Sequence, residues 1–105
     1  MRVQNMTSNT SGRGVTNQFI IYDATIKVPT IRGKDTIIKP ETGTAFQSYN
    51  TIIAFDTQTQ VYLDEIAWDY SHTTGKYRNQ FLGESRKETE AKIKSGEYIL
   101  TDLNN

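Results

Sequence analysis

The chain has 105 residues, of which 35% are hydrophobic, and it carries 12 basic and 12 acidic side chains. This length fits one domain with a modest core, and the charge balance gives no overall field that would attract nucleic acid. The absence of cysteine excludes disulfides, thiolate nucleophiles and cysteine-ligated zinc. No secretory signal or run of about 20 apolar residues is visible, so we expect a cytoplasmic protein without a membrane span.

The N-terminal segment and the hairpin that follows it differ sharply in composition. Residues 1–16 are mostly Asn, Thr, Ser, Gly and Arg, which predicts a flexible tail before a domain at 17–105. Residues 24–40 place β-prone runs on both sides of a turn-forming segment at 32–35. This pattern predicts a hairpin that projects from the main sheet and ends at Pro40, because proline limits strand pairing.

The remaining β-prone segments predict a sheet of about five strands. Residues 19–22 form the first of them, and 60–64 and 98–100 are two others. Residues 44–49 and 51–55 indicate either one bent strand or a strand with a bulge. The connections between most of these segments are short, which favours a mainly antiparallel sheet.

The first predicted helix follows the only tryptophan. Ser71 or Thr73 can cap a helix over residues 74–82, in which Tyr77 and Phe81 lie four apart on one face. We expect this helix to pack on the sheet through these two rings.

A second, short C-terminal helix is predicted at about 86–95. Ser85 and Glu88 match a capping box at its start, and its few apolar residues predict a mostly solvated helix. The fold class expected from all these elements is α+β, with the first helix packed on one face of the sheet and Trp68 near their junction.

The candidates for chemistry are weak. The only histidine, His72, lies near Asp69 and Ser71, but close neighbours in a loop usually diverge, and helix capping accounts better for Ser71. Asp64 and Glu65 lack the alternating oxygen ligands of a calcium loop. We therefore predict no catalytic residue, no metal site and no cofactor, although the spatial separation of carboxylates stays open.

The aromatic residues indicate a contact surface. Neighbours along a strand point to opposite faces, so all the rings cannot enter one small core. Exposed tyrosines beside cations are typical of protein contacts, and they can also stack single-stranded bases. Packing of the rings in the core is the third interpretation. The candidate partner-binding residues are Tyr49, Tyr62, Tyr70, His72, Lys76, Arg78, Arg32 and Lys34.

Several short motifs are shared with a known group of proteins. They are Phe46-Gln47-Ser48-Tyr49, Trp68-Asp69-Tyr70-Ser71, Thr73-Thr74, Lys76-Tyr77 and Phe81-Leu82-Gly83. On these residues the chain resembles a family of small uncharacterised proteins of tailed bacteriophages and related mobile elements. The resemblance covers most of the chain after residue 16, and it departs from the family in the length of residues 24–43.

This resemblance implies a phage origin and expression in the host cytoplasm, and it brings no established activity. We expect a small non-enzymatic binding module with a host or phage protein as partner, for example an inhibitor of a host defence system such as an anti-CRISPR protein. One alternative is a single-stranded nucleic-acid-binding protein. Another is a small nucleotide-binding protein or enzyme with a pocket lined by Tyr70, His72, Lys76 and Arg78.

Overall fold

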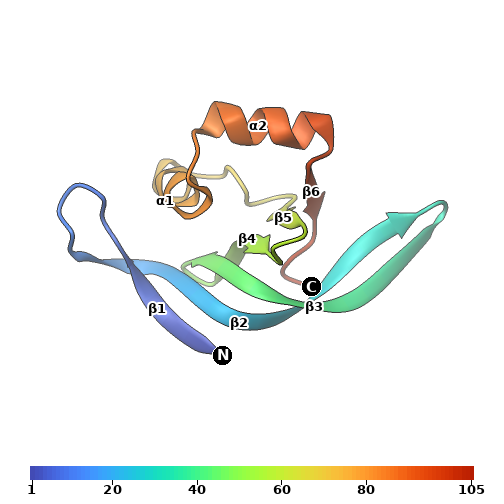
Figure 1. Cartoon of the computed structure of the whole chain (residues 1–105), viewed down its shortest axis with the longest axis horizontal. Coiled ribbons are helices and arrows are strands. Elements are labelled where there is room, and N and C mark those ends of the chain that lie inside the picture. Colours follow the sequence, from blue (N-terminus) through green and yellow to red (C-terminus); the bar gives the residue numbers. More distant parts are fainter.

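The computed structural model describes residues 1–105 and contains one six-stranded sheet and two helices (Figure 1). The elements are β1 (Arg2–Thr7), β2 (Gly14–Arg32), β3 (Asp35–Ser48), β4 (Thr51–Asp56), β5 (Val61–Asp64), α1 (His72–Leu82), α2 (Arg86–Ser95) and β6 (Tyr98–Thr101). The strands lie in the order β1-β2-β3-β4-β5-β6. The predicted α+β class and the mainly antiparallel sheet are confirmed, with one strand more than expected.

The additional strand is β1, so the prediction of a flexible tail over 1–16 is wrong for residues 2–7. It is wrong for residues 14–16 as well, because β2 begins at Gly14. β1 pairs antiparallel with β2 and begins opposite Tyr22. The guanidinium carbon of Arg2 lies 4.3 Å from the centroid of the Tyr22 ring, and Met6 is buried. The other side chains of β1 are exposed. β1 is therefore held by its ladder hydrogen bonds together with the burial of Met6, and the polar composition indicated neither.

Beyond the end of β4, β2 and β3 continue as a two-stranded ribbon (Figure 1). The hairpin predicted over 24–40 is present, with Arg32 paired to Asp35 beside the turn. The predicted stop at Pro40 is wrong, because the pairing passes through Pro40 and reaches Gly43 before a bulge in β2.

Both prolines of the ribbon occupy positions where a strand needs no N–H group. Thr101 Oγ1 donates to Pro29 O, and Asn105 Nδ2 donates to Lys27 O, so these two residues of β2 direct their backbone groups away from β3. Pro40 pairs with Lys27 and therefore directs its missing N–H to the free edge of β3. Proline is compatible with an edge of this kind.

Residues 44–49 and 51–55 belong to two antiparallel strands and not to one bent strand. Ser48 of β3 pairs with Thr51 of β4 across a two-residue turn. Tyr49 in this turn has a φ of 56°, and its N–H donates to Asn17 O at 2.7 Å. The backbone bond to β2 holds a tyrosine in a conformation that favours glycine or asparagine, which is why the turn was missed.

β6 lies parallel to β5, and this pairing was not predicted. The connection between them contains both helices, which is the long crossover that parallel strands require. The helices lie above one face of the sheet in Figure 1.

Each face of the sheet carries its own core. The core beneath the helices consists of Met6, Phe46, Ile53, Ala54, Leu63, Ala67, Tyr77 and Tyr98, with Trp68 and Phe81 packed against it. The rings of Phe46 and Phe81 stack with centroids 5.8 Å apart, so the predicted packing of α1 through Tyr77 and Phe81 is confirmed. The opposite core consists of Ala24, Val28, Ala45, Phe55, Tyr62 and Leu103.

Gly43 marks a close approach between β3 and the end of β4. A Cβ atom at this position would overlap Asp56 O and lie 2.9 Å from Thr57 Cα. Since backbone would have to move, we expect Gly43→Ala to lower the free energy of unfolding by about 2 kcal/mol in a urea titration. The matched control is Gly14→Ala, where a Cβ atom meets nothing within 4 Å. Equal losses in the two variants would contradict this explanation.

Candidate functional site

The stretch around the only tryptophan forms a loop and α1. Ser71 Oγ accepts a hydrogen bond from Thr74 N at 3.1 Å, and Gly83 ends the helix with a φ of 70°. Of the two predicted N-cap candidates, Ser71 caps the helix, which begins at His72, two residues earlier than expected. Ser48 Oγ lies 3.0 Å from Thr74 Oγ1, which fixes the start of α1 on β3.

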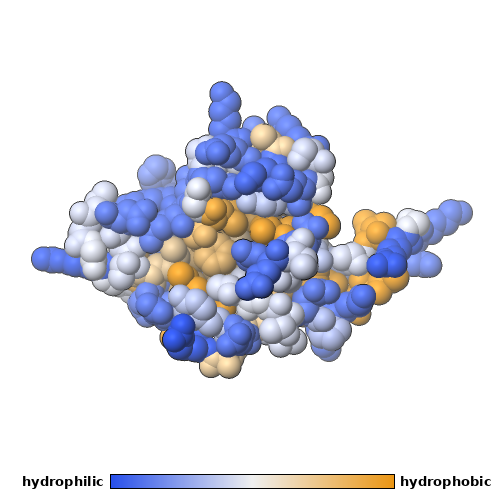
Figure 2. Space-filling model, viewed as in Figure 1, coloured by the Kyte–Doolittle hydropathy of each residue, from blue (hydrophilic) through white to orange (hydrophobic).

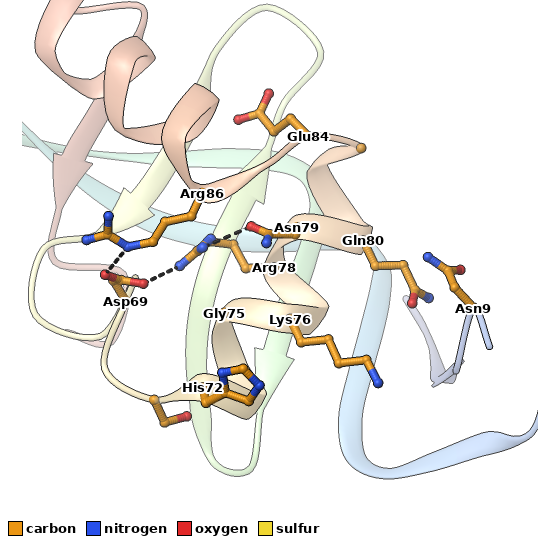
Figure 3. A pocket seen from close by; sticks show the side chains of 12 residues that line it. Asn9, Asp69, His72, Gly75, Lys76, Arg78, Asn79, Gln80, Glu84 and Arg86 are labelled. Carbon is orange, nitrogen blue, oxygen red and sulfur yellow. Dashed lines mark hydrogen bonds and ion pairs between the residues drawn. The ribbon is translucent and has the colours of Figure 1, made fainter. Parts of the chain in front are cut away.

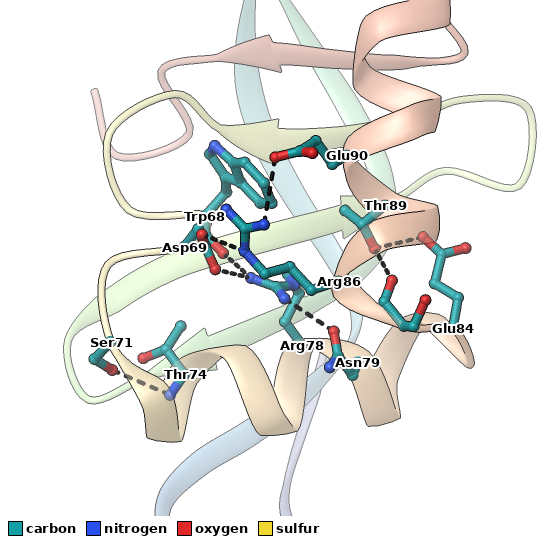
Figure 4. Close-up of polar contacts among 11 residues, drawn as sticks. Trp68, Asp69, Ser71, Thr74, Arg78, Asn79, Glu84, Arg86, Thr89 and Glu90 are labelled. Atoms are coloured by element: carbon teal, nitrogen blue, oxygen red, sulfur yellow. Dashed lines mark hydrogen bonds and ion pairs between the residues drawn. The ribbon is translucent and has the colours of Figure 1, made fainter.

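Arg78 of α1 points inward and is 1% exposed. Its Nη1 donates to Asp69 Oδ1 at 2.9 Å and to Trp68 O at 2.7 Å, and its Nη2 donates to Asn79 Oδ1 at 2.9 Å (Figure 4). A buried charge costs several kcal/mol unless it is paired and hydrogen-bonded. These partners satisfy Nη1 and Nη2, while the buried Nε has no hydrogen-bond partner.

Arg86 at the start of α2 binds the same carboxylate, with Nε donating to Asp69 Oδ2 at 2.7 Å. The guanidinium carbons of Arg78 and Arg86 lie 5.2 and 5.7 Å from the centroid of the Trp68 ring, within the range of cation–π contacts. Partial burial raises the pKa of Asp69, but the hydrogen bonds from the two arginines outweigh burial and hold the pKa below its ordinary value. This cluster joins the loop, α1 and α2.

Glu84 organises a second buried cluster between the helices and β6. Its carboxylate accepts hydrogen bonds from Thr89 Oγ1 at 2.6 Å, Lys92 Nζ at 2.7 Å and Tyr98 OH at 2.9 Å. Burial raises the pKa of Glu84, but these three donors outweigh burial and lower the pKa. Glu88 instead completes the predicted capping box, because its Oε1 accepts from Ser85 N at 3.1 Å.

A polar groove of about 670 Å³ runs along the outer side of α1 (Figure 3). His72 and Lys76 line it, but the groove contains no apolar side chain. In Figure 3 the hydrogen bonds join Asp69 to Arg78 and Arg86 and leave His72 aside. Ser71 Oγ accepts a hydrogen bond from Thr74 N and caps α1, and it makes no hydrogen bond with His72. No three His, Asp or Glu side chains gather to hold a metal ion.

Two of the predicted contact residues are unavailable to a partner, so their assignment is wrong. Arg78 is enclosed by the Trp68 loop, and Tyr62 is buried in the second core, where its ring stacks on Phe55 with centroids 6.5 Å apart. Tyr62 was assigned to the surface because alternation places the rings on both faces of the sheet and one small core cannot hold them all. The sheet carries a second core on its other face, which buries Tyr62.

The other predicted contact residues lie on separate surfaces. Tyr49 and Tyr70 are exposed in the β3–β4 turn and in the loop before α1, and His72 and Lys76 lie on the outer face of α1. Arg32 and Lys34 lie at the far tip of the ribbon (Figure 1). These residues therefore do not form one contact surface.

The ribbon carries apolar residues that the sequence analysis did not select. Ile31 is 80% exposed and Ile38 is 56% exposed, and the pairing of Pro29 with Ile38 places all three on one face of the ribbon. Figure 2 shows this apolar surface on the projecting arm, bordered by hydrophilic residues at the tip. The signal was the adjacent pair Ile37-Ile38, since neighbours in a strand point to opposite faces and both faces of a projecting ribbon cannot be buried.

The fold and these surfaces define a small α+β domain with a projecting β-ribbon. The chain belongs to a family described as of unknown function (DUF8033), whose model matches residues 1–98. The match includes the ribbon and both helices. No curated protein and no solved structure shows significant similarity to the chain. Both helices are too short and too polar to cross a membrane.

Proposed function

We propose that this chain is a non-enzymatic binding module whose β2–β3 ribbon docks a partner protein. The observation that carries this proposal is the exposure of Ile31 and Ile38 on an arm that extends from the domain. Exposed apolar patches with a polar rim mark protein-interaction sites. The exposed side chains of Lys27 and Thr36 lie on the same face and supply such a rim. Arg32, Lys34 and Lys39 add positive charge at the tip and on the opposite face of the ribbon, which favours a partner with acidic residues near the apolar contact.

The resemblance to proteins of tailed bacteriophages and mobile elements makes a host protein the partner in this proposal. Its most concrete form is the inhibition of a host defence complex, as by an anti-CRISPR protein. A protein of this size would act by occupying a surface that the complex needs.

Replacing both isoleucines should weaken partner binding. We expect Ile31→Ser/Ile38→Ser to weaken the complex at least about tenfold, because loss of a hot-spot contact at the centre of an interface costs about 2 kcal/mol or more. The immobilised wild-type chain and the variant are exposed to host lysate, and the dissociation constant is then measured for the retained protein. Ile66→Ser is the matched control, since Ile66 is 85% exposed but lies in the loop before α1. Retention of the same protein by the double variant would contradict the proposal.

The same cations make nucleic acid the competing ligand. A labelled single-stranded oligonucleotide titrated into the chain at low and high salt separates the two, because phosphate contacts weaken steeply with salt and apolar contacts do not. Tight binding that is lost with salt and with Arg32→Ser/Lys34→Ser would favour the nucleic-acid alternative.

A further inference from the structure

A groove of about 400 Å³ separates the outer half of β2 from the free edge of β6. Pro29 and Ile31 line it from the ribbon, and Ile99 and Leu100 line it from β6. Leu100 is 38% exposed although it lies in the middle of a strand.

The register of β6 shows which of its backbone groups face the groove. Thr101 O accepts a hydrogen bond from Glu65 N at 2.9 Å, so Thr101 directs its backbone groups to β5. Alternate residues of a parallel strand share this direction, so Ile99 also faces β5, while the N–H and C=O of Leu100 face outward. β6 has β5 as its only strand neighbour, which leaves the backbone of Leu100 without a strand partner.

The facing wall of the groove is also an unpaired edge. Lys27 O and Pro29 O accept from side chains of the C-terminal segment, so residues 27, 29 and 31 of β2 direct their backbone groups away from β3. The N–H and C=O of Ile31 therefore point to the open side. Thr101 Oγ1 bonds to Pro29 O where the two edges approach, and Pro29 has no N–H with which to continue a ladder to β6.

We propose that this groove binds an extended peptide segment of the partner protein by β-strand addition. The proposal rests on the docking function of the ribbon and specifies what the partner inserts. A strand between Ile31 and Leu100 would pair with the free backbone groups of both walls and place an apolar side chain between theirs.

The charges of the groove define the partner further. Glu65 and Asp102 line it and neither takes part in an ion pair. Charge complementarity therefore calls for a lysine or arginine next to the apolar residue of the inserted strand. The occupant is thus an extended segment with alternating apolar residues and a flanking basic residue.

The first test uses the free chain. Amide hydrogen exchange followed by NMR should be at least about tenfold faster at Leu100 than at Ile99 and Thr101, whose N–H groups donate to β5. Equal protection of the three amides would show that the edge is already covered and would overturn the proposal.

The second test identifies a ligand and its binding mode. A phage-displayed library of random peptides of about eight residues, long enough to span β6, is panned against the full chain. The enriched peptide is synthesised with N-methylation at each residue in turn. We expect alternate N-methylations to weaken binding at least about tenfold and the intervening ones to leave it unchanged, because only every second N–H of an added strand pairs with a given edge.

Variants separate this proposal from the docking function itself. Leu100→Pro removes the outward N–H and should weaken the peptide at least about tenfold, with circular dichroism confirming that the sheet persists. If peptide binding were weakened by mutation of Ile38 but unchanged by Leu100→Pro and by N-methylation of the peptide, strand addition would be overturned. Docking of the partner on the side chains of the ribbon would remain intact. Partner capture that is lost on mutating the ribbon, without enrichment of any peptide, would do the same. Failure of both peptide enrichment and partner capture would overturn both proposals.

Discussion

Arg78→Ala should lower the free energy of unfolding by about 3–5 kcal/mol, because removal of one partner from a buried ion pair leaves the other charge and the hydrogen-bond acceptors around it without a partner. The guanidinium binds Asp69, Trp68 O and Asn79 at 2.7–2.9 Å. Since domains of this size are stable by about 5–15 kcal/mol, the variant should lie near the limit of folding. Urea unfolding followed by the emission of Trp68, the only tryptophan, measures the loss at the contact itself.

Arg78→Lys and Lys76→Ala distinguish the contact from a general effect on α1. Lysine keeps the charge but cannot reproduce the fork of hydrogen bonds, so we expect an intermediate loss. Lys76 is exposed on the same helix, and its replacement should change stability by less than about 0.5 kcal/mol. Similar losses in Arg78→Ala and Lys76→Ala would show that the buried cluster does not stabilise the fold.

The helices could be predicted because their ends are encoded by local side chains. Ser71 and Gly83 cap the two ends of α1, and Ser85 with Glu88 caps the start of α2. Each capping residue lies within one turn of the helix end that it stabilises. The packing of α1 followed from a repeat that is equally local, Tyr77 and Phe81.

The errors arose where the deciding partner is distant in sequence. β1 is polar, and only its ladder with β2 makes it a strand. Pro40 does not end its strand. Its pairing with Lys27 directs its nitrogen away from β2, and β4 does not extend far enough to need a hydrogen bond there, so the missing N–H costs no ladder bond. Register and edge position depend on the assembled sheet, so composition and local pattern could not give either.

The candidate site was predicted only in part for the same reason. The projecting hairpin was recognised from its turn and alternation, but the sequence analysis selected its cations and none of its isoleucines, because the face to which each residue points depends on the strand register. Arg78 was assigned to the surface because its partners, Trp68 and Asp69, meet it only when the loop folds back over α1.

Glu84→Gln should destabilise the chain by about 2–3 kcal/mol at pH 7 and by much less in acid. At neutral pH the ionised carboxylate accepts three hydrogen bonds, which are stronger than those to a neutral amide. Because the pKa of Glu84 in the folded chain is lowered, its stabilisation is fully present above the ordinary glutamate pKa of about 4.3. It is lost as the pH falls through the lower folded-state value, where the protonated acid resembles glutamine.

The measurement compares urea unfolding of the wild type and Glu84→Gln at pH 7 and at about pH 3. Other carboxylates with lowered pKa values, Asp69 and Glu88, destabilise both chains in acid, so the difference between the chains isolates Glu84. Glu97→Gln is the matched control, because Glu97 is a second carboxylate near Lys92, at 4.0 Å, and is exposed. This variant should change the free energy of unfolding by less than about 0.5 kcal/mol. A difference between wild type and Glu84→Gln that stays constant from pH 7 to acid would mean that the carboxylate does not act through its charge.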